Sequence, residues 1–99
     1  MADYLLLYEG GSMPETEAEQ AAVMKAWTDW FSELGSAVKD GGNPTSGQAT
    51  TIGSGTAPAV SGYSVITADS LSDAEALAKG CPVLQGGATV HVIETFEVM

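Results

Sequence analysis

Hydrophobic and polar positions in the second half of the chain follow two different periods. Residues 62–68 and 88–98 are rich in Val, Ile, Thr and aromatic side chains, which favour strands. Between these segments, apolar residues recur at near-helical spacing, at Leu71, Ala74, Leu77 and Ala78. Ser70 is suited to cap the start of this helix, and Gly80 followed by Pro82 is suited to end it. The pattern predicts a β-α-β unit.

The first forty residues repeat this plan, beginning with a strand at 3–9. Large apolar side chains occupy both its even positions and its odd positions, namely Tyr4, Leu6 and Tyr8 against Leu5 and Leu7. A strand that is apolar on both faces suits the middle of a sheet that is covered on both sides. We therefore expect this strand to be central.

A long amphipathic helix is predicted next. Thr16, with Glu19 three residues later, forms a capping-box signature, and Gly35 ends the periodic segment. The expected inward face consists of Val23, Trp27, Trp30 and Leu34. Residues 37–61, which follow, are rich in Gly, Ser, Thr, Ala and Pro, and only Val38–Lys39 and Thr50–Ile52 favour a strand. They predict a weak hairpin strand and a mobile loop at about 44–59.

Residues 1–99 thus predict one domain with the element order βαββαβ. This order is typical of the α+β ferredoxin-like arrangement, a four-stranded antiparallel sheet with two helices on one face. The other face would lack a cover, although the first strand is apolar on that side as well. A homodimer that buries the two open faces against each other, a dimeric α+β barrel, would satisfy the pattern.

The composition limits the kinds of molecule that this chain is expected to bind. Thirteen acidic residues against three Lys and no Arg give a net charge of −10, which opposes binding to nucleic acid and to anionic membrane surfaces. No apolar run approaches the roughly 20 residues that a membrane span needs. The start of the chain lacks the basic region of a signal peptide, and the chain has a single cysteine. We expect a cytoplasmic protein.

Several phrases of the sequence resemble the YCII-related proteins, which include the branch named for a DGPF motif. They are YLLLYEGG, AVMKAWTDWFSELG, DGGNP, GYSVITADSLSDAEALAKGCPVL and GGATVHVIETF, and they are spread along nearly the whole chain. The resemblance implies a dimeric α+β barrel. It also implies a cleft between the first helix and the sheet of each subunit.

For activity, the resemblance implies less. Some family members have a proposed acid–base pair, a His in the first helix and an Asp before the Pro that follows the second helix, and a few relatives have known or suspected dehydrochlorinase or lactone-isomerase-like chemistry. The matching positions hold Met24 and Cys81 here, and neither can act as a His–Asp pair. The DGPF tetrapeptide is absent, and the phrase EVRP near the end reads HVIE.

Proton transfer would therefore need side chains at other positions of the chain. His91 is its only histidine, and histidine is the side chain whose ordinary pKa lies nearest neutrality, so His91 is a candidate general acid or base. A lone histidine in a strand is also often a hydrogen-bonded or interfacial residue. Asp40 could present a carboxylate to a cleft, but an Asp before two glycines is also a typical turn residue.

A pocket for a small neutral or aromatic ligand is expected from apolar and phenolic side chains. The candidates are Met24, Trp27, Tyr8, Tyr63 and Cys81. The thiol of Cys81 is expected to be buried and inert, because it follows the C-terminal end of a helix. No cofactor and no metal is expected, since one His and one Cys offer no ligand spacing.

Two functions remain open from the sequence. One is an enzyme of lyase or isomerase type that acts on a cyclic or aromatic metabolite, with His91 and Asp40 as candidates for proton transfer. The other is a non-catalytic dimeric binding or accessory protein that has kept the barrel and lost the His–Asp pair.

Overall fold

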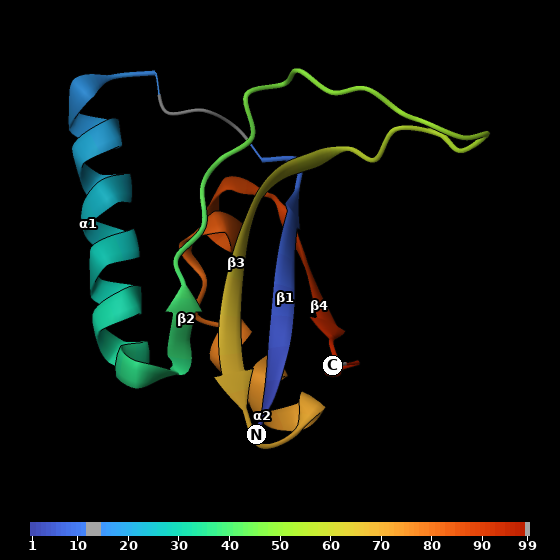
Figure 1. Cartoon of the computed structure of the whole chain (residues 1–99). Coiled ribbons are helices and arrows are strands. Elements are labelled where there is room, and N and C mark those ends of the chain that lie inside the picture. The colour runs from blue at the N-terminus through green and yellow to red at the C-terminus, as the bar shows by residue number, and fades with distance from the viewer. Residues whose placement is uncertain (12–14, 99) are drawn as a thin grey trace.

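The computed structural model describes residues 1–11 and 15–98. In chain order, the elements are β1 (Ala2–Glu9), α1 (Glu17–Leu34), the 3-10 turn η1 (Gly35–Ala37), β2 (Val38–Asp40), β3 (Val60–Ala68), α2 (Leu71–Ala78), the 3-10 turn η2 (Pro82–Gly86) and β4 (Thr89–Glu94). The strands form one antiparallel sheet in the order β2-β3-β1-β4 (Figure 1). The predicted ferredoxin-like α+β arrangement is confirmed, and β1 is central as expected.

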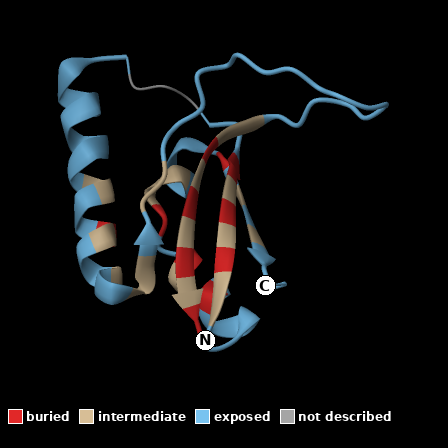
Figure 2. Ribbon diagram, in the orientation of Figure 1, coloured by how far each residue is buried: buried red, intermediate tan, exposed pale blue. Residues whose placement is uncertain are grey.

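Side chains of β1 alternate between the two faces of this sheet. Tyr4, Leu6 and Tyr8 face the helices and are 1%, 0% and 4% exposed. Leu5 and Leu7 point the other way and are only partly buried, because no helix covers that side (Figure 2). We call this side the open face. By strand register it carries Asp3, Leu5, Leu7 and Glu9 from β1, Tyr63, Val65 and Thr67 from β3, and His91 and Ile93 from β4.

The helix starts are capped as the sequence predicts. Thr16 Oγ1 accepts a hydrogen bond from the backbone N–H of Glu19, and Ser70 Oγ accepts one from Asp73, both at 3.1 Å. Each bond satisfies an N–H group that has no partner inside its own helix. Gly35 ends α1 at a φ of 56°. These local signals set the helix boundaries.

The two helices cover the sheet unequally. The small side chains of Ala74 and Ala78 let α2 pack closely on the central strands. Only the C-terminal half of α1 reaches the core, where Trp30 is 4% exposed and donates a hydrogen bond from Nε1 to the carbonyl oxygen of Leu77 at 3.2 Å. A side chain on Gly80 would press on the Trp30 ring, so glycine permits this contact between the helices.

Three finer expectations were wrong. Val23 and Leu71, placed on inward helix faces by periodicity, are 40% and 52% exposed. They lie in parts of the helices that extend beyond the packed contact, and periodicity cannot show where that contact stops. Thr50–Ile52 forms no strand.

Residues 44–59, which we call the arm, project from the end of the sheet (Figure 1). The arm begins at a bridge between Pro44 and Gly62, where Thr45 also donates from its N–H to the carbonyl oxygen of Ser61 at 2.9 Å. Every residue of the arm is exposed, and Ile52 is 96% exposed. The predicted mobility of this segment stays a prediction.

Gly42, just before the arm, allows a close approach of two backbone segments. Its φ is +75°, and a Cβ there would overlap the carbonyl oxygen of Tyr63. Gly47 also has a positive φ, of +91°, but a Cβ there would meet nothing within 4 Å. Alanine substitutions at Gly42 and Gly47 can therefore distinguish backbone strain from steric overlap.

We expect Gly47→Ala to lower the free energy of unfolding by about 1–2 kcal/mol, through the positive φ alone. Gly42→Ala should cost about 3 kcal/mol or more, because the overlap adds to the same strain. Denaturant unfolding of both variants measures the difference. Equal losses would show that the approach of Gly42 to Tyr63 does not constrain the fold.

Candidate functional site

The open face brings together a histidine and a carboxylate from two adjacent strands. Nε2 of His91 on β4 lies 2.8 Å from Oε2 of Glu9 at the end of β1. His91 is paired across the strands with Leu7, and Glu9 is the next residue of β1 on the same face. The two side chains are about half exposed, at 48% and 51%. They are thus paired with each other and accessible to a ligand.

The local backbone helps to place Glu9. β1 pairs regularly with β3 up to Tyr8, and the register then shifts by one residue so that Glu9 lies opposite Val60. The extra residue, Ser61, lies on β3, so the bulge increases the local twist next to Glu9. The pairing of β1 with β4 stays regular as far as Glu9 and Thr89. Bulges of this kind often occur beside functional sites.

This geometry determines which nitrogen of His91 is available. A carboxylate only accepts hydrogen bonds, so Nε2 of His91 carries a hydrogen and donates a hydrogen bond to Glu9. In the neutral ring the lone pair then lies on Nδ1, which can accept a proton from a ligand. Glu9 would stabilise the imidazolium that results, in the way that a carboxylate supports the histidine of a catalytic triad.

The floor beside the pair is apolar. Leu7 lies between His91 on β4 and Tyr63 on β3 in one row across the sheet, and Leu5 lies between Ile93 and Val65 in the next row. At the far end of the face, Lys39 forms an ion pair with Asp3. Both carboxylates of the face therefore have a partner, and the centre between them is uncharged.

Asp40 lies apart from this site. Its Oδ1 accepts a hydrogen bond from the N–H of Gly42 at 2.8 Å, which makes it a turn residue. It belongs to β2 at one edge of the sheet, whereas His91 belongs to β4 at the other. Three strand spacings amount to about 14 Å. Within one chain, therefore, the two sequence-based proton-transfer candidates do not come together.

The five pocket candidates divide between the two faces and the solvent. Tyr8, Trp27 and Cys81 belong to the core on the helix side, where the rings of Tyr8 and Trp27 lie 5.5 Å apart. Tyr63 lies on the open face. It is paired with Leu7 of β1, which is paired on its other side with His91. Met24 is 71% exposed on α1. Only Tyr63 shares a surface with His91.

A buried chain of hydroxyl groups lies under α1. The Tyr8 hydroxyl donates to Ser64 Oγ at 2.7 Å, and Ser64 Oγ donates to the carbonyl oxygen of Gly41 at 2.7 Å. Burial raises the pKa of Tyr8 above its ordinary value. Burial also raises the pKa of the Cys81 thiol, with the N–H of Val83 and the Tyr8 hydroxyl acting in the opposite direction. These neutral groups anchor the segment before the arm to the sheet.

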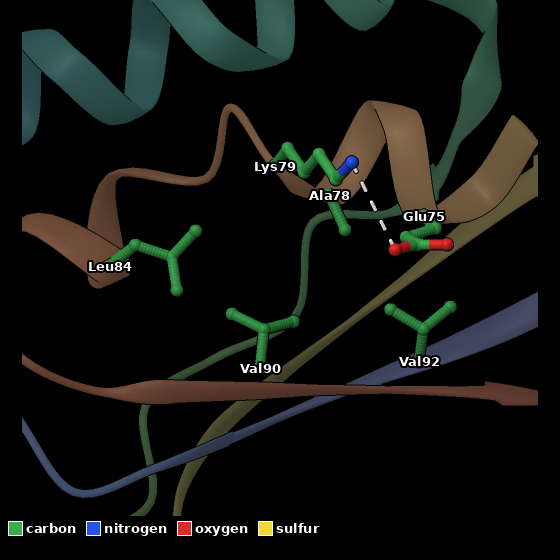
Figure 3. A pocket seen from close by; sticks show the side chains of 6 residues that line it. All are labelled: Glu75, Ala78, Lys79, Leu84, Val90 and Val92. Carbon is green, nitrogen blue, oxygen red and sulfur yellow. Dashed lines mark ion pairs between the residues drawn. The ribbon is translucent and has the colours of Figure 1, made fainter. Parts of the chain in front are cut away.

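Two surface hollows lie away from the pair. One, of about 190 Å³, lies between α2 and β4, where Ala78, Leu84, Val90 and Val92 form an apolar wall (Figure 3). Glu75 and Lys79, 4.0 Å apart, stand at its rim. The other, of about 480 Å³, lies where the two ends of the chain meet, around Asp3, Lys39 and Phe96. Neither hollow is the cleft between α1 and the sheet that the resemblance implied.

Within residues 1–11 and 15–98, no group of three or more His, Cys, Asp or Glu side chains could hold a metal ion. Among the helices of the same residues, none is long and apolar enough to cross a membrane.

Glu9 is the site residue that sequence reasoning missed. In a ferredoxin-like order the first and last strands are neighbours, so polar residues on these two strands could have been compared. The register that aligns Glu9 with His91, 82 positions away, is set by the pairing of β1 with β4 in the folded sheet.

The fold and the site together define a small α+β protein with a histidine–carboxylate pair on an uncovered sheet face. No family model matches the chain, and no curated protein matches it in sequence. Among solved structures, it is similar to 5-chloro-2-hydroxyhydroquinone dehydrochlorinase (TftG) from Burkholderia phenoliruptrix AC1100, solved in complex with 2,5-dihydroxybenzoquinone. The TM-score is 0.55 at 17% identity, over 95% of this chain and 93% of the other. This likeness shows the fold.

The reactivity of the buried Cys81 thiol directly tests the packing on the helix side of the sheet. Cys81 is 2% exposed and its pKa is raised, so both access and ionisation oppose reaction. With Ellman's reagent at pH 8, we expect the native protein to react at least about 100-fold more slowly than the same thiol in denaturant. Comparable rates would show that Cys81 is open to solvent.

Proposed function

We propose that this chain is a YCII-related protein that forms a homodimer, binds a small neutral or aromatic molecule on its open face, and acts on that molecule as a lyase or isomerase through His91 and Glu9. The observation that carries the proposal is the 2.8 Å contact between His91 Nε2 and Glu9 Oε2 on a half-exposed apolar surface. Buried pairs of this kind often serve structure, but an exposed one beside an apolar floor suits a ligand.

The chemistry follows from the assignment of the protons. Nδ1 of His91 takes a proton from a hydroxyl or acidic C–H group of the ligand, and Glu9 stabilises the resulting imidazolium. For an isomerase, the proton returns to a different atom of the ligand. For a lyase, the electron pair left on the ligand expels a leaving group such as chloride, and the proton passes to solvent.

The choice of ligand class has two supports. The net charge of −10 disfavours an anionic ligand, and Leu7 and Tyr63 offer an apolar and a phenolic surface beside His91. The structurally similar dehydrochlorinase is named for a chlorinated hydroquinone and was solved with a quinone. The first support favours a neutral ring compound, and the second suggests that the ring carries hydroxyl groups.

A second candidate function is non-catalytic binding within the same dimer. Met24 is 71% exposed and Cys81 is a buried thiol of raised pKa, so the positions that match the family's acid–base pair hold no proton-transfer groups. A protein of this kind would bind a ring compound without converting it. Turnover of any ring compound that depends on His91 would exclude this alternative.

Two measurements test the proposal. One is the release of chloride from 5-chloro-2-hydroxyhydroquinone, and the other is the binding of unsubstituted hydroquinone, measured by calorimetry. We expect His91→Gln and Glu9→Gln each to lower turnover by about 100-fold or more, which is the usual contribution of general acid–base catalysis. Glu94→Gln is the matched control. Its carboxylate lies on β4 but accepts a hydrogen bond from Tyr4 on the helix side, at 3.0 Å.

Turnover that survives in His91→Gln would rule out the proposed chemistry. Hydroquinone binding with no turnover of any tested ring compound would favour the non-catalytic alternative. Circular dichroism of each variant would separate loss of the site from loss of the fold.

Dimerisation through the open face has its own test. Leu5→Asp puts a charge in the centre of that face, whereas Leu84→Asp puts the same charge on an exposed apolar residue of η2 on the helix side. Light scattering at micromolar concentration should show a dimer for the wild type and for Leu84→Asp, and a monomer for Leu5→Asp, because an unpaired buried charge is costly. A monomeric wild type, or equal behaviour of the two variants, would contradict the proposed interface.

A further inference from the structure

The arm is exposed along its whole length. All residues of 44–59 are exposed, and the apolar Ile52 is 96% exposed. In Figure 1 the arm runs outward from the end of the sheet. In an isolated protomer, Ile52 lies outside the core and contributes no stabilisation by burial.

The arm belongs to an uncharged stretch of a strongly acidic chain. No Asp, Glu, Lys, Arg or His occurs from Gly41 to Ala68, although the chain carries a net charge of −10. Two copies of such a chain repel each other over most of their surfaces. The arm and the centre of the open face are the parts that two copies can bring together with the least repulsion.

The base of the arm lies beside the proposed site. Gly62, which bridges to Pro44 at the base, pairs with Tyr8 of β1, and Val60 pairs with Glu9. The arm therefore leaves the sheet at the end that holds the His91–Glu9 pair. In a face-to-face dimer it starts close to the seam between the two sheets.

The size of the open face also calls for additional contact. Strands β1, β2, β3 and β4 have 8, 3, 9 and 6 residues. At about 3.3 Å per residue and about 4.8 Å between strands, they present roughly 400 Å² in projection. A standard stable interface buries about 800 Å² of accessible surface on each partner. The accessible area of the open face is larger than its projected area, because side chains make the surface uneven. An arm that lies on the partner would add further buried area.

We propose that, in the homodimer, the arm of one protomer lies beside the seam between the two sheets, against the end of its partner's open face that holds the His91–Glu9 pair, and closes that site, with Ile52 as its apolar anchor. This inference rests on the proposed function, because it requires both the dimer and the open-face site. The second copy completes the site. An uncharged cover would exclude water and favour a neutral ring compound over an anion.

Cross-linking of the full chain tests the position of the arm. Ile52→Cys introduces an exposed thiol for benzophenone maleimide, while Cys81 is buried. Dimers that mix ¹⁵N-labelled and unlabelled chains show by mass whether a cross-linked pair of peptides comes from one chain or two. Glu33→Cys, on the exposed side of α1, is the matched control.

The expected result is a cross-link between chains that joins position 52 to peptides of the open face, such as those with Leu7 or His91, and no such product from position 33. From a protein shown to be dimeric, a cross-link within one chain, a link to α1 of the partner, or no link would overturn the inference and leave the proposed function standing. A wild type that is monomeric by light scattering would overturn both.

A second measurement uses the affinity between protomers. Ile52→Asp should weaken dimerisation roughly tenfold or more, because it removes a buried apolar anchor. Gln48→Glu adds the same charge to the arm without removing an apolar group and should have a clearly smaller effect. Equal effects of the two substitutions would contradict a role for Ile52 as the anchor.

Discussion

The central strand imposes the constraint on which the rest of the structure depends. β1 is apolar on both faces, so the sheet needs a cover on each side. The chain supplies one cover, from α2 and the C-terminal half of α1, and Tyr4, Leu6 and Tyr8 are buried beneath it. Leu5 and Leu7 on the other face are left partly exposed. The candidate site and the proposed dimer both follow from this unequal cover.

The distribution of polar groups fits the two roles of the sheet. The buried polar groups on the helix side are neutral, as in the chain from Tyr8 through Ser64 to the Gly41 carbonyl group, and they serve packing. On the open face the charged groups stand at the ends, as the Asp3–Lys39 and Glu9–His91 pairs, around an apolar centre. A surface of this kind can be covered while each of its carboxylates keeps a hydrogen-bond partner.

Sequence reasoning succeeded where the controlling interactions are local or periodic. The caps at Thr16 and Ser70 and the two-sided pattern of β1 depend on residues within a few positions of one another, and the element order then indicates the sheet. The partnership of Glu9 with His91 spans 82 positions and depends on the register between β1 and β4, which no local pattern encodes. The exposure of Val23 has a similar origin, because periodicity identifies a helix face but not the length over which it is covered.

The bridge between Pro44 and Gly62 has a consequence for how such a protein can change over time. It closes the sheet before the arm begins, so residues inserted into or deleted from the arm leave the pairing of β1, β3 and β4 unaltered. Longer loops add little closure entropy, about 0.6 kcal/mol for each doubling of length. The fold therefore tolerates changes in the length and composition of the arm, so descendants of one ancestral sequence can alter the cover of the site while the strands that carry Glu9 and His91 keep their register.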